Sequence, residues 1–169
     1  MRFLIIFIFL ITNVFAEDVS NIKNIVIHKV PKTYDNVIFL DKSEQEININ
    51  QLKGSLLILN FWATWCKPCK EEMPSLDSLQ ANQELNHLKI FPINVGKENL
   101  EKINRYFVEL NIQNMQTYFD PPTTLAKTFS LRGIPTSILF NKEGKEFARI
   151  IGSINFEDEK FVNWIKNYN

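Results

Sequence analysis

The sequence predicts an α/β domain in which helices cover a central mixed β-sheet, with a short N-terminal β extension ahead of it. Two continuous apolar runs, at residues 56–61 and 88–95, are typical of strands buried on both faces. Segments with helical spacing alternate with these runs, and this alternation requires a sheet that is covered on both sides. Two later strands, at 136–140 and 147–151, flank the turn signal Asn141–Gly144. They form an antiparallel hairpin, so the sheet is predicted to be mixed.

The other elements follow from shorter patterns and from residues that interrupt helices. Gly54 ends a single helical turn, and Pro74 is expected to kink the first long helix. Residues 17–32 show no clear period and are expected to form an irregular edge. In chain order these elements are strands at 37–40 and 47–49, a helical turn at 50–54, helices at 67–82 and 99–110, a strand at 118–119, and helices at 123–129 and 156–168.

The first 16 residues are interpreted as an export signal that is removed from the mature protein. Arg2 precedes an unbroken apolar run at 3–11, and Val14-Phe15-Ala16 offers a cleavage site. The alternative is an uncleaved membrane anchor. A spanning helix needs about 20 apolar residues, and this run ends at Thr12. No cysteine lies at the cleavage point, so a lipoprotein is not expected.

Composition restricts the class of partner. The chain has 169 residues, which is enough for one domain with a substantial core. It carries 19 Lys and Arg against 19 Asp and Glu. A neutral chain is not expected to bind nucleic acid or an anionic membrane surface as its main partner. An exported domain of this size with only two cysteines does not need a disulfide scaffold, so the pair is interpreted as catalytic.

The two cysteines, Cys66 and Cys69, lie where a predicted buried strand leads into a predicted helix. Because a helix N-terminus stabilises a thiolate, Cys66 is the predicted nucleophile and Cys69, one turn later, the predicted resolving thiol. Pro68 fits the first turn of a helix, Lys67 adds a positive charge, and Trp65 offers a substrate an apolar contact. The alternatives are a structural disulfide and half of a zinc site. Such a short loop gives little entropic stabilisation, and the chain has no second cysteine pair.

With these motifs the chain resembles the thioredoxin fold and, within it, the TlpA/ResA-like family of exported thiol–disulfide oxidoreductases. The resemblance spans about residues 37–168. It rests on Leu52-Lys53-Gly54, on residues 59–74 around Trp65-Cys66-Lys67-Pro68-Cys69, on Gly133-Ile134-Pro135-Thr136, on Lys142-Glu143-Gly144-Lys145 and on Gly152. The chain is accordingly divided into a signal peptide at 1–16, an extension at 17–36 and a thioredoxin-like domain at 37–169.

The resemblance implies further site residues. Pro135 matches a proline that follows a cis peptide bond and turns the backbone of Ile134 toward the cysteines, where an extended substrate can pair with it. Gly133 permits close approach. Asn60 stands where cytoplasmic thioredoxins carry a buried aspartate, and asparagine cannot titrate. We therefore expect Glu72, one turn after the second cysteine, to accept its proton, with a pKa raised by partial burial. The alternative is a solvated surface glutamate.

The resemblance also implies a function. It points to a periplasmic enzyme that reduces specific protein disulfides, of the cytochrome c maturation or respiratory-oxidase assembly type, through a dithiol–disulfide cycle. A membrane electron donor of the DsbD/CcdA type is implied, no cofactor or metal is expected, and the chain is expected to be a monomer. Two alternatives stay open. One is a disulfide-forming oxidant, although oxidants typically carry a histidine between the cysteines. The other is a Cu(I)-binding metallochaperone, because Cu(I) favours sulfur ligands.

Overall fold

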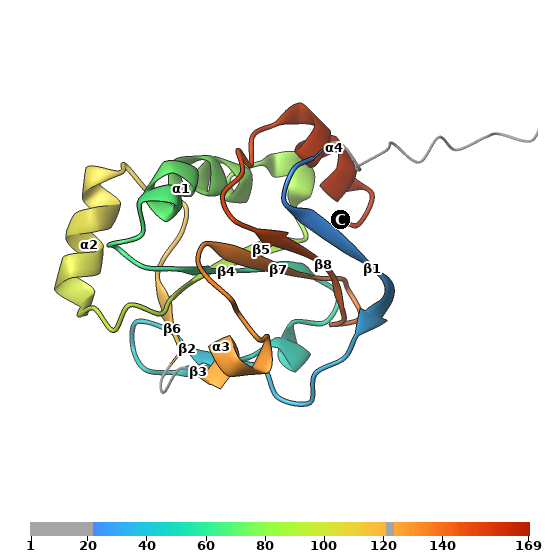
Figure 1. Cartoon of the computed structure of the whole chain (residues 1–169), viewed down its shortest axis with the longest axis horizontal. Helices are drawn as coiled ribbons and strands as arrows, with labels where there is room; N and C mark the ends of the chain where they lie inside the picture. Colours follow the sequence, from blue (N-terminus) through green and yellow to red (C-terminus); the bar gives the residue numbers. More distant parts are fainter. Residues whose placement is uncertain (1–21, 121–123) are drawn as a thin grey trace, which may run out of the picture.

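The computed structural model describes residues 22–120 and 124–169, built around an eight-stranded sheet (Figure 1). Along the sheet the strands lie in the order β1-β8-β7-β4-β5-β6-β2-β3. The strands are β1 (Ile25–Lys32), β2 (Ile38–Leu40), β3 (Glu46–Asn48), β4 (Leu56–Trp62), β5 (Leu88–Asn94), β6 (Tyr118–Phe119), β7 (Thr136–Phe140) and β8 (Glu146–Ile151). The helices are α1 (Lys67–Gln80), α2 (Leu100–Glu109), α3 (Thr124–Thr128) and α4 (Glu159–Lys166), with short 3-10 turns at Ile49–Leu52 and Gln83–Leu85.

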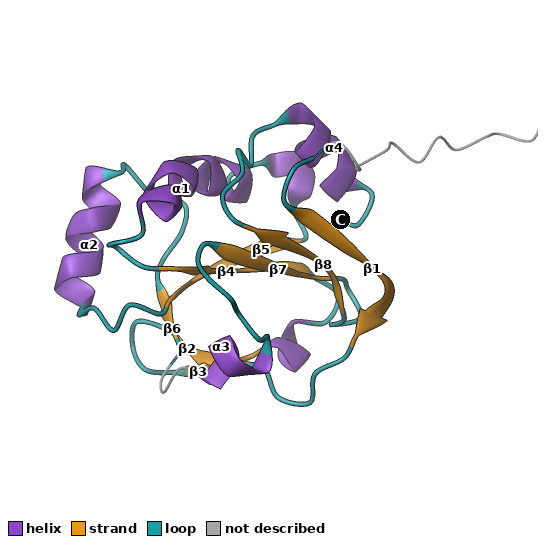
Figure 2. Ribbon diagram, viewed as in Figure 1, coloured by secondary structure: helices purple, strands orange, loops and turns teal. Residues whose placement is uncertain are grey.

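The central strand is β4, which is parallel to β5 and antiparallel to β7. This arrangement confirms the predicted mixed sheet. Figure 2 shows α1, α2 and α4 on one side of the sheet and α3 on the other. All seven residues of β4 are buried, as expected for a strand covered on both faces.

Alternate side chains of β4 supply two separate cores. The side under α1, α2 and α4 receives Leu56, Ile58 and Trp62, and the side under α3 receives Leu57, Leu59 and Phe61. Because strand side chains alternate between faces, Asn60 belongs to the α1 side. The sequence therefore places a polar side chain in the middle of the core that α1 covers.

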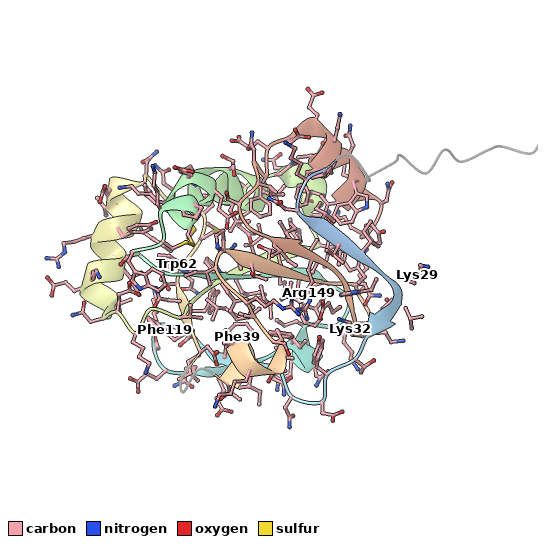
Figure 3. The ribbon with its side chains drawn as sticks, viewed as in Figure 1. Lys29, Lys32, Phe39, Trp62, Phe119 and Arg149 are labelled. Atoms are coloured by element: carbon pink, nitrogen blue, oxygen red, sulfur yellow. A yellow bond between two sulfur atoms is a disulfide. The ribbon has the colours of Figure 1, made fainter. Side chains whose placement is uncertain are left out.

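The N-terminal extension is more regular than the sequence predicts. Instead of an irregular edge it forms β1, which pairs antiparallel with β8 and shifts register between Ile27 and Lys32. Pro31 is tolerated because β1 is an edge strand, where a missing N–H costs no ladder hydrogen bond. Figure 3 shows Lys29 of this strand projecting outward, whereas Trp62 lies in the interior.

A buried carboxylate ties the extension to the sheet. Glu146, at the start of β8, is fully buried. It accepts hydrogen bonds from Tyr34 Oη at 2.5 Å and from the guanidinium of Arg149, and its Oε1 lies 2.6 Å from His28 Nε2. Burial acts to raise the pKa of Glu146, but the hydrogen bonds from Arg149, Tyr34 and His28 hold that pKa below its ordinary value. The carboxylate therefore stays ionised.

Helix ends differ from the prediction where a polar side chain satisfies the first backbone N–H groups. The closing helix, α4, is expected from residue 156 but begins at Glu159. The Asp158 side chain caps it by accepting hydrogen bonds from the N–H groups of Lys160 at 2.9 Å and Phe161 at 3.4 Å.

The first long helix, α1, continues as one element through Pro74, which lies on its exposed side.

Several predictions fall partly or wholly outside the described residues. The predicted signal segment at 1–16 lies outside them, as do residues 17–21 of the extension and Thr123, the expected first residue of a helix. Within residues 22–120 and 124–169, no helix has the length and apolar character needed to cross a bilayer.

Candidate active site

Cys66 is the N-cap residue of α1, at the end of the loop that leaves β4. Its Sγ accepts a hydrogen bond from the backbone N–H of Cys69 at 3.3 Å. Lys67 and Pro68 are the first two residues of the helix, where Pro68 needs no N–H partner. The sulfur therefore sits at the positive end of the helix dipole, a position that stabilises a thiolate.

The two cysteines form a disulfide with a Cα–Cα distance of 5.3 Å. They are not equally accessible: Cys66 is 5% exposed and Cys69 is fully buried. Around them Trp65 is 68% exposed, and Lys67 and Pro68 are also exposed. A partner molecule can therefore reach Cys66 across a surface that contains an apolar ring and a positive charge, but it cannot reach Cys69 directly.

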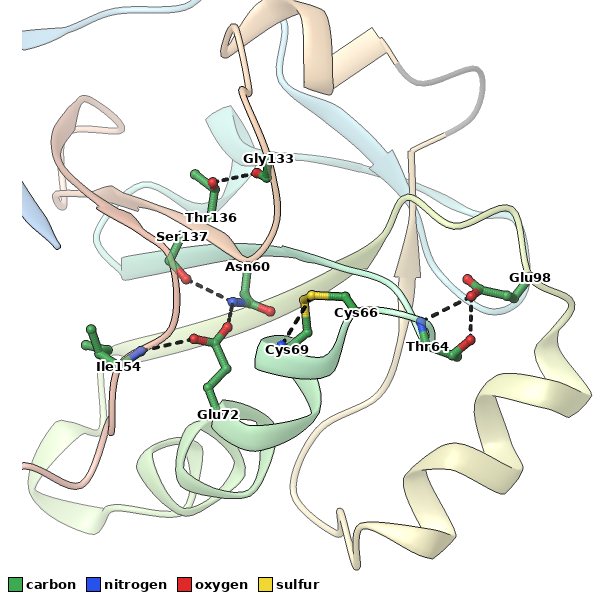
Figure 4. The surroundings of a disulfide bond; sticks show 10 residues. All are labelled: Asn60, Thr64, Cys66, Cys69, Glu72, Glu98, Gly133, Thr136, Ser137 and Ile154. Atoms are coloured by element: carbon green, nitrogen blue, oxygen red, sulfur yellow. Dashed lines mark hydrogen bonds between the residues drawn. A yellow bond between two sulfur atoms is a disulfide. The ribbon is translucent and has the colours of Figure 1, made fainter.

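A carboxylate from another loop holds the segment before the cysteines. Glu98, between β5 and α2, accepts hydrogen bonds from Thr64 N at 3.1 Å and Thr64 Oγ1 at 2.5 Å (Figure 4). Burial acts to raise the pKa of Glu98, but the Thr64 hydrogen bonds and the charge of Lys102 bring it below its ordinary value. Glu98 is absent from the predicted site, because nothing in the sequence links it to a residue 34 positions earlier.

Glu72 lies one turn after Cys69 and is only 2% exposed. Its Oε1 accepts a hydrogen bond from Asn60 Nδ2 at 2.8 Å, and its Oε2 accepts one from the backbone N–H of Ile154 at 3.3 Å (Figure 4). Burial raises the pKa of Glu72 to about 8, although both hydrogen bonds act to lower it. Glu72 is therefore not the solvated surface glutamate that was the alternative expectation.

Asn60 connects Glu72 to a neighbouring strand. Its Nδ2 also donates to Ser137 Oγ at 2.9 Å, and Asn60 and Ser137 are directly paired in the β4–β7 ladder. Ser137 is absent from the predicted site, although a serine in a strand that is buried throughout needs a hydrogen-bond partner. No sequence signal pointed to the Ile154 backbone.

A pocket of about 500 Å³ reaches Glu72 from the side of α1. Its other walls are the polar side chains Ser75, Ser153, Asn155 and Glu157, together with Glu71, Pro74 and Ile154. The carboxyl group thus forms part of a pocket wall although it is almost completely buried. Water in a polar pocket of this size can exchange protons with Glu72.

The loop before β7 contributes the last predicted site residues. The Ile134–Pro135 peptide bond is cis, the isomer that the sequence analysis expected. Strand register pairs Thr136, the first residue of β7, with Phe61, one residue before the end of β4. The loop before β7 therefore lies at the same end of these two strands as the loop that carries the cysteines. A Cβ atom at Gly133 would meet no atom within 4 Å, which leaves open space in front of the loop.

The described residues contain no group of three or more His, Cys, Asp or Glu side chains placed to hold a metal ion. The predicted residues instead form two adjacent groups. One is the first turns of α1, with Cys66, Cys69 and Glu72, and the other is the loop from Gly133 to Pro135. A dithiol pair beside a buried carboxyl group is suited to thiol–disulfide exchange coupled to proton transfer.

Comparisons with known proteins agree with this geometry. The family model of the AhpC/TSA family matches residues 28–145. A thiol-disulfide oxidoreductase ResA of Bacillus cereus is 32% identical over 124 residues, which are 73% of this chain and 70% of ResA.

Solved structures agree as well. StoA from Bacillus subtilis superposes with a TM-score of 0.63 at 27% identity, over 78% of this chain and 98% of StoA. A thiol:disulfide interchange protein of the thioredoxin family from Chlorobium tepidum TLS superposes with a TM-score of 0.67 at 24% identity, over 83% of this chain and 98% of that protein. These likenesses confirm the predicted thioredoxin-like fold.

Proposed function

Because this chain belongs to the AhpC/TSA family and is 32% identical to a thiol-disulfide oxidoreductase ResA over 73% of its length, we propose that it reduces disulfide bonds of specific exported proteins. The observation that carries this proposal is the disulfide between Cys66, at the N-cap of α1, and the fully buried Cys69. A structural disulfide has no need of a helix N-terminus beside one of its sulfurs. A nucleophilic thiolate does.

The reaction runs through a mixed disulfide. The thiolate of Cys66 attacks one sulfur of the substrate disulfide and forms an S–S bond to it, and the other substrate sulfur leaves as a thiolate. Cys69 then loses its proton, and its thiolate attacks Cys66 Sγ. The Cys66–Cys69 disulfide forms, and the second substrate sulfur leaves with the electron pair. The substrate gains two electrons and the enzyme is oxidised.

Glu72 is proposed to accept the proton of Cys69. Its pKa of about 8 lies close to the ordinary thiol value of about 8.5, so the ionised fraction of Glu72 can accept the proton and release it again. The pocket beside Glu72 offers a route by which the proton then reaches solvent. This route avoids the surface on which the substrate would be bound.

The substrate is proposed to lie along the loop before β7. The backbone of Ile134 would pair with an extended segment of the client protein, and the open space at Gly133 accommodates its approach. Pro135 shapes this loop, and the exposed side chains of Trp65, Lys67 and Pro68 would contact the client beyond the reacting sulfur.

The location and partners are also proposals. The apolar segment at 3–11 and the small residue Ala16 support export to the periplasm by a cleaved signal peptide at 1–16. The remaining divisions are an extension at 17–36 and a thioredoxin-like domain at 37–169. The enzyme would be a monomer. In an oxidising compartment its disulfide would be reduced again by a membrane electron donor of the DsbD/CcdA type. Its clients would belong to cytochrome c maturation or respiratory-oxidase assembly.

The reduction potential of the Cys66–Cys69 pair at pH 7 tests the direction of the reaction. A value at or below about −250 mV, toward the thioredoxin value of about −270 mV, is expected for a reductase. A value close to that of the strong oxidant DsbA, about −120 mV, would contradict the proposal and identify a disulfide-forming enzyme.

Copper loading of the reduced protein tests the remaining alternative, a Cu(I) metallochaperone. A reductase should reduce insulin or another protein disulfide when no copper is supplied. Stoichiometric and tight Cu(I) binding by the two thiolates, with no turnover of protein disulfides, would contradict the proposal.

A further inference from the structure

A fully buried oxygen next to the disulfide has no hydrogen-bond partner. Asn60 is 0% exposed, and its Nδ2 makes two hydrogen bonds, to Glu72 Oε1 at 2.8 Å and Ser137 Oγ at 2.9 Å. Its Oδ1, in contrast, accepts none. Buried acceptors in proteins are nearly always paired, and each exception requires an explanation.

The orientation of the amide is set by its two neighbours. The Nδ2 group faces Glu72 Oε1 and Ser137 Oγ, to which it donates, so Oδ1 points the other way. Figure 4 shows Oδ1 directed to the side of the amide on which the Cys66–Cys69 disulfide lies. Both Asn60 and Cys69 belong to the core between β4 and α1, and both are fully buried.

The redox state of the enzyme explains the missing partner. In the disulfide, Cys69 Sγ carries no hydrogen and cannot donate. After two electrons and two protons have been added, the S–S bond is broken and Cys69 becomes a thiol, with one S–H donor. That donor is created in the same buried layer as the unpaired oxygen.

We infer that Asn60 Oδ1 accepts the hydrogen bond of the Cys69 thiol in the reduced enzyme, so that one amide side chain bridges the thiol and the Glu72 carboxyl group. The inference rests on the proposed function, since it describes the reduced half of that cycle. When the client is released, the Cys69 S–H proton is transferred to the Glu72 carboxylate, the bond between Cys66 and the client sulfur breaks, and the Cys66–Cys69 bond forms. Oδ1 thereby loses its donor and becomes unpaired again.

This role favours the reduced state. In the oxidised enzyme the buried oxygen lacks a partner, which destabilises that form, whereas in the reduced enzyme the oxygen is satisfied. Removing Oδ1 therefore relieves the unpaired acceptor in the oxidised form and also removes a hydrogen bond from the reduced form. Both effects favour the disulfide. A variant without it should hold its disulfide more tightly than the wild type does.

The first test measures the equilibrium between dithiol and disulfide against a thiol redox buffer. Asn60→Leu, which keeps the approximate size but removes Oδ1, should shift this equilibrium about three- to tenfold toward the disulfide, the change expected for one hydrogen bond. Ser137→Ala is the matched control, because it disturbs the same amide through Nδ2 but leaves Oδ1 intact. It should change the equilibrium less than about twofold. Equal shifts in both variants would overturn the inference.

The second test does not require the Asn60 variant to fold. In Cys66→Ala, Cys69 is the only thiol and no hydroxyl is introduced beside it, so its infrared S–H stretching band can be observed alone. A hydrogen-bonded thiol should absorb at a lower frequency than a free thiol in an apolar solvent. A band at the free-thiol frequency would overturn the inference. The proposed function is tested separately, by the reduction potential of the wild-type protein and by its ability to reduce a protein disulfide.

Discussion

Replacing Glu72 with glutamine should remove a loss of stability that the wild-type protein suffers as pH rises. Burial raises the pKa of Glu72 in the folded state to about 8 from an ordinary value of 4.5. Between pH 4.5 and about pH 8, Glu72 therefore stays protonated in the folded protein but is ionised in the unfolded chain. The folded state therefore binds more protons than the unfolded state in this window. The free energy of unfolding consequently falls as pH rises from about 4.5, and the loss is complete above about 8.

The size of the effect follows from the same two values. A difference from 4.5 to about 8, at about 1.36 kcal/mol for each pH unit, means that ionising Glu72 destabilises the folded state by about 5 kcal/mol. About 4 kcal/mol of this loss falls between pH 5 and pH 9. Glutamine cannot ionise, so the Glu72→Gln variant should gain about 4 kcal/mol relative to wild type across this interval.

The assay is urea unfolding of the oxidised protein at pH 5 and at pH 9. The glutamine amide turns an N–H group toward the Ile154 N–H, which donates to Glu72 in the wild type. That cost is the same at both pH values and cancels in the comparison. Glu71→Gln is the matched control, since Glu71 is exposed and its loss should leave the pH dependence unchanged. The reasoning would be refuted if the free energy of unfolding changed by the same amount between pH 5 and pH 9 in Glu72→Gln and in wild type.

Three further outcomes follow from the site and its scaffold. Cys69→Ser should accumulate a covalent mixed disulfide between Cys66 and a client, visible on non-reducing gels, because no second thiol can release the client; free client and enzyme alone would contradict the assigned roles. Removing the charge of Glu146 by Glu146→Gln should lower the free energy of unfolding by about 3–5 kcal/mol, since Arg149 would keep a largely buried charge without its partner; a loss below about 1 kcal/mol in urea titrations would argue against this. Trp65→Ala should change stability by less than about 0.5 kcal/mol, because the ring is 68% exposed, yet raise KM for a protein disulfide; an unchanged KM would remove Trp65 from the substrate surface.

The elements that the sequence predicts well are those whose pattern is set by burial. β4 is a run of apolar residues because both of its faces are covered, and its continuity identifies it as central without any other information. The Cys-x-x-Cys spacing and the proline before β7 are local sequence signals, so both could be recognised without knowledge of the fold. The edge strand β1 was less predictable, because a strand exposed along most of its length has no strong period.

The residues that the sequence analysis missed act through contacts that are long-range in the chain. Glu98 reaches Thr64 across 34 positions, and the Ile154 N–H reaches Glu72 across 82. A backbone donor has no side-chain signature, and an acidic residue in a polar loop looks like any solvated charge. Partial burial of Glu72 was expected from the resemblance, but its near-complete burial was not, because it depends on the backbone at 153–155 lying against α1.

The unequal burial of the two sulfurs also constrains the order of events in turnover. With Cys69 sealed in the core and only Cys66 reachable, the molecule that delivers electrons and the molecule that receives them must approach the same atom. The two cannot occupy the enzyme at once, so no ternary complex forms and the kinetics must be double-displacement. An excess of either partner should therefore inhibit turnover by competing with the other for the enzyme.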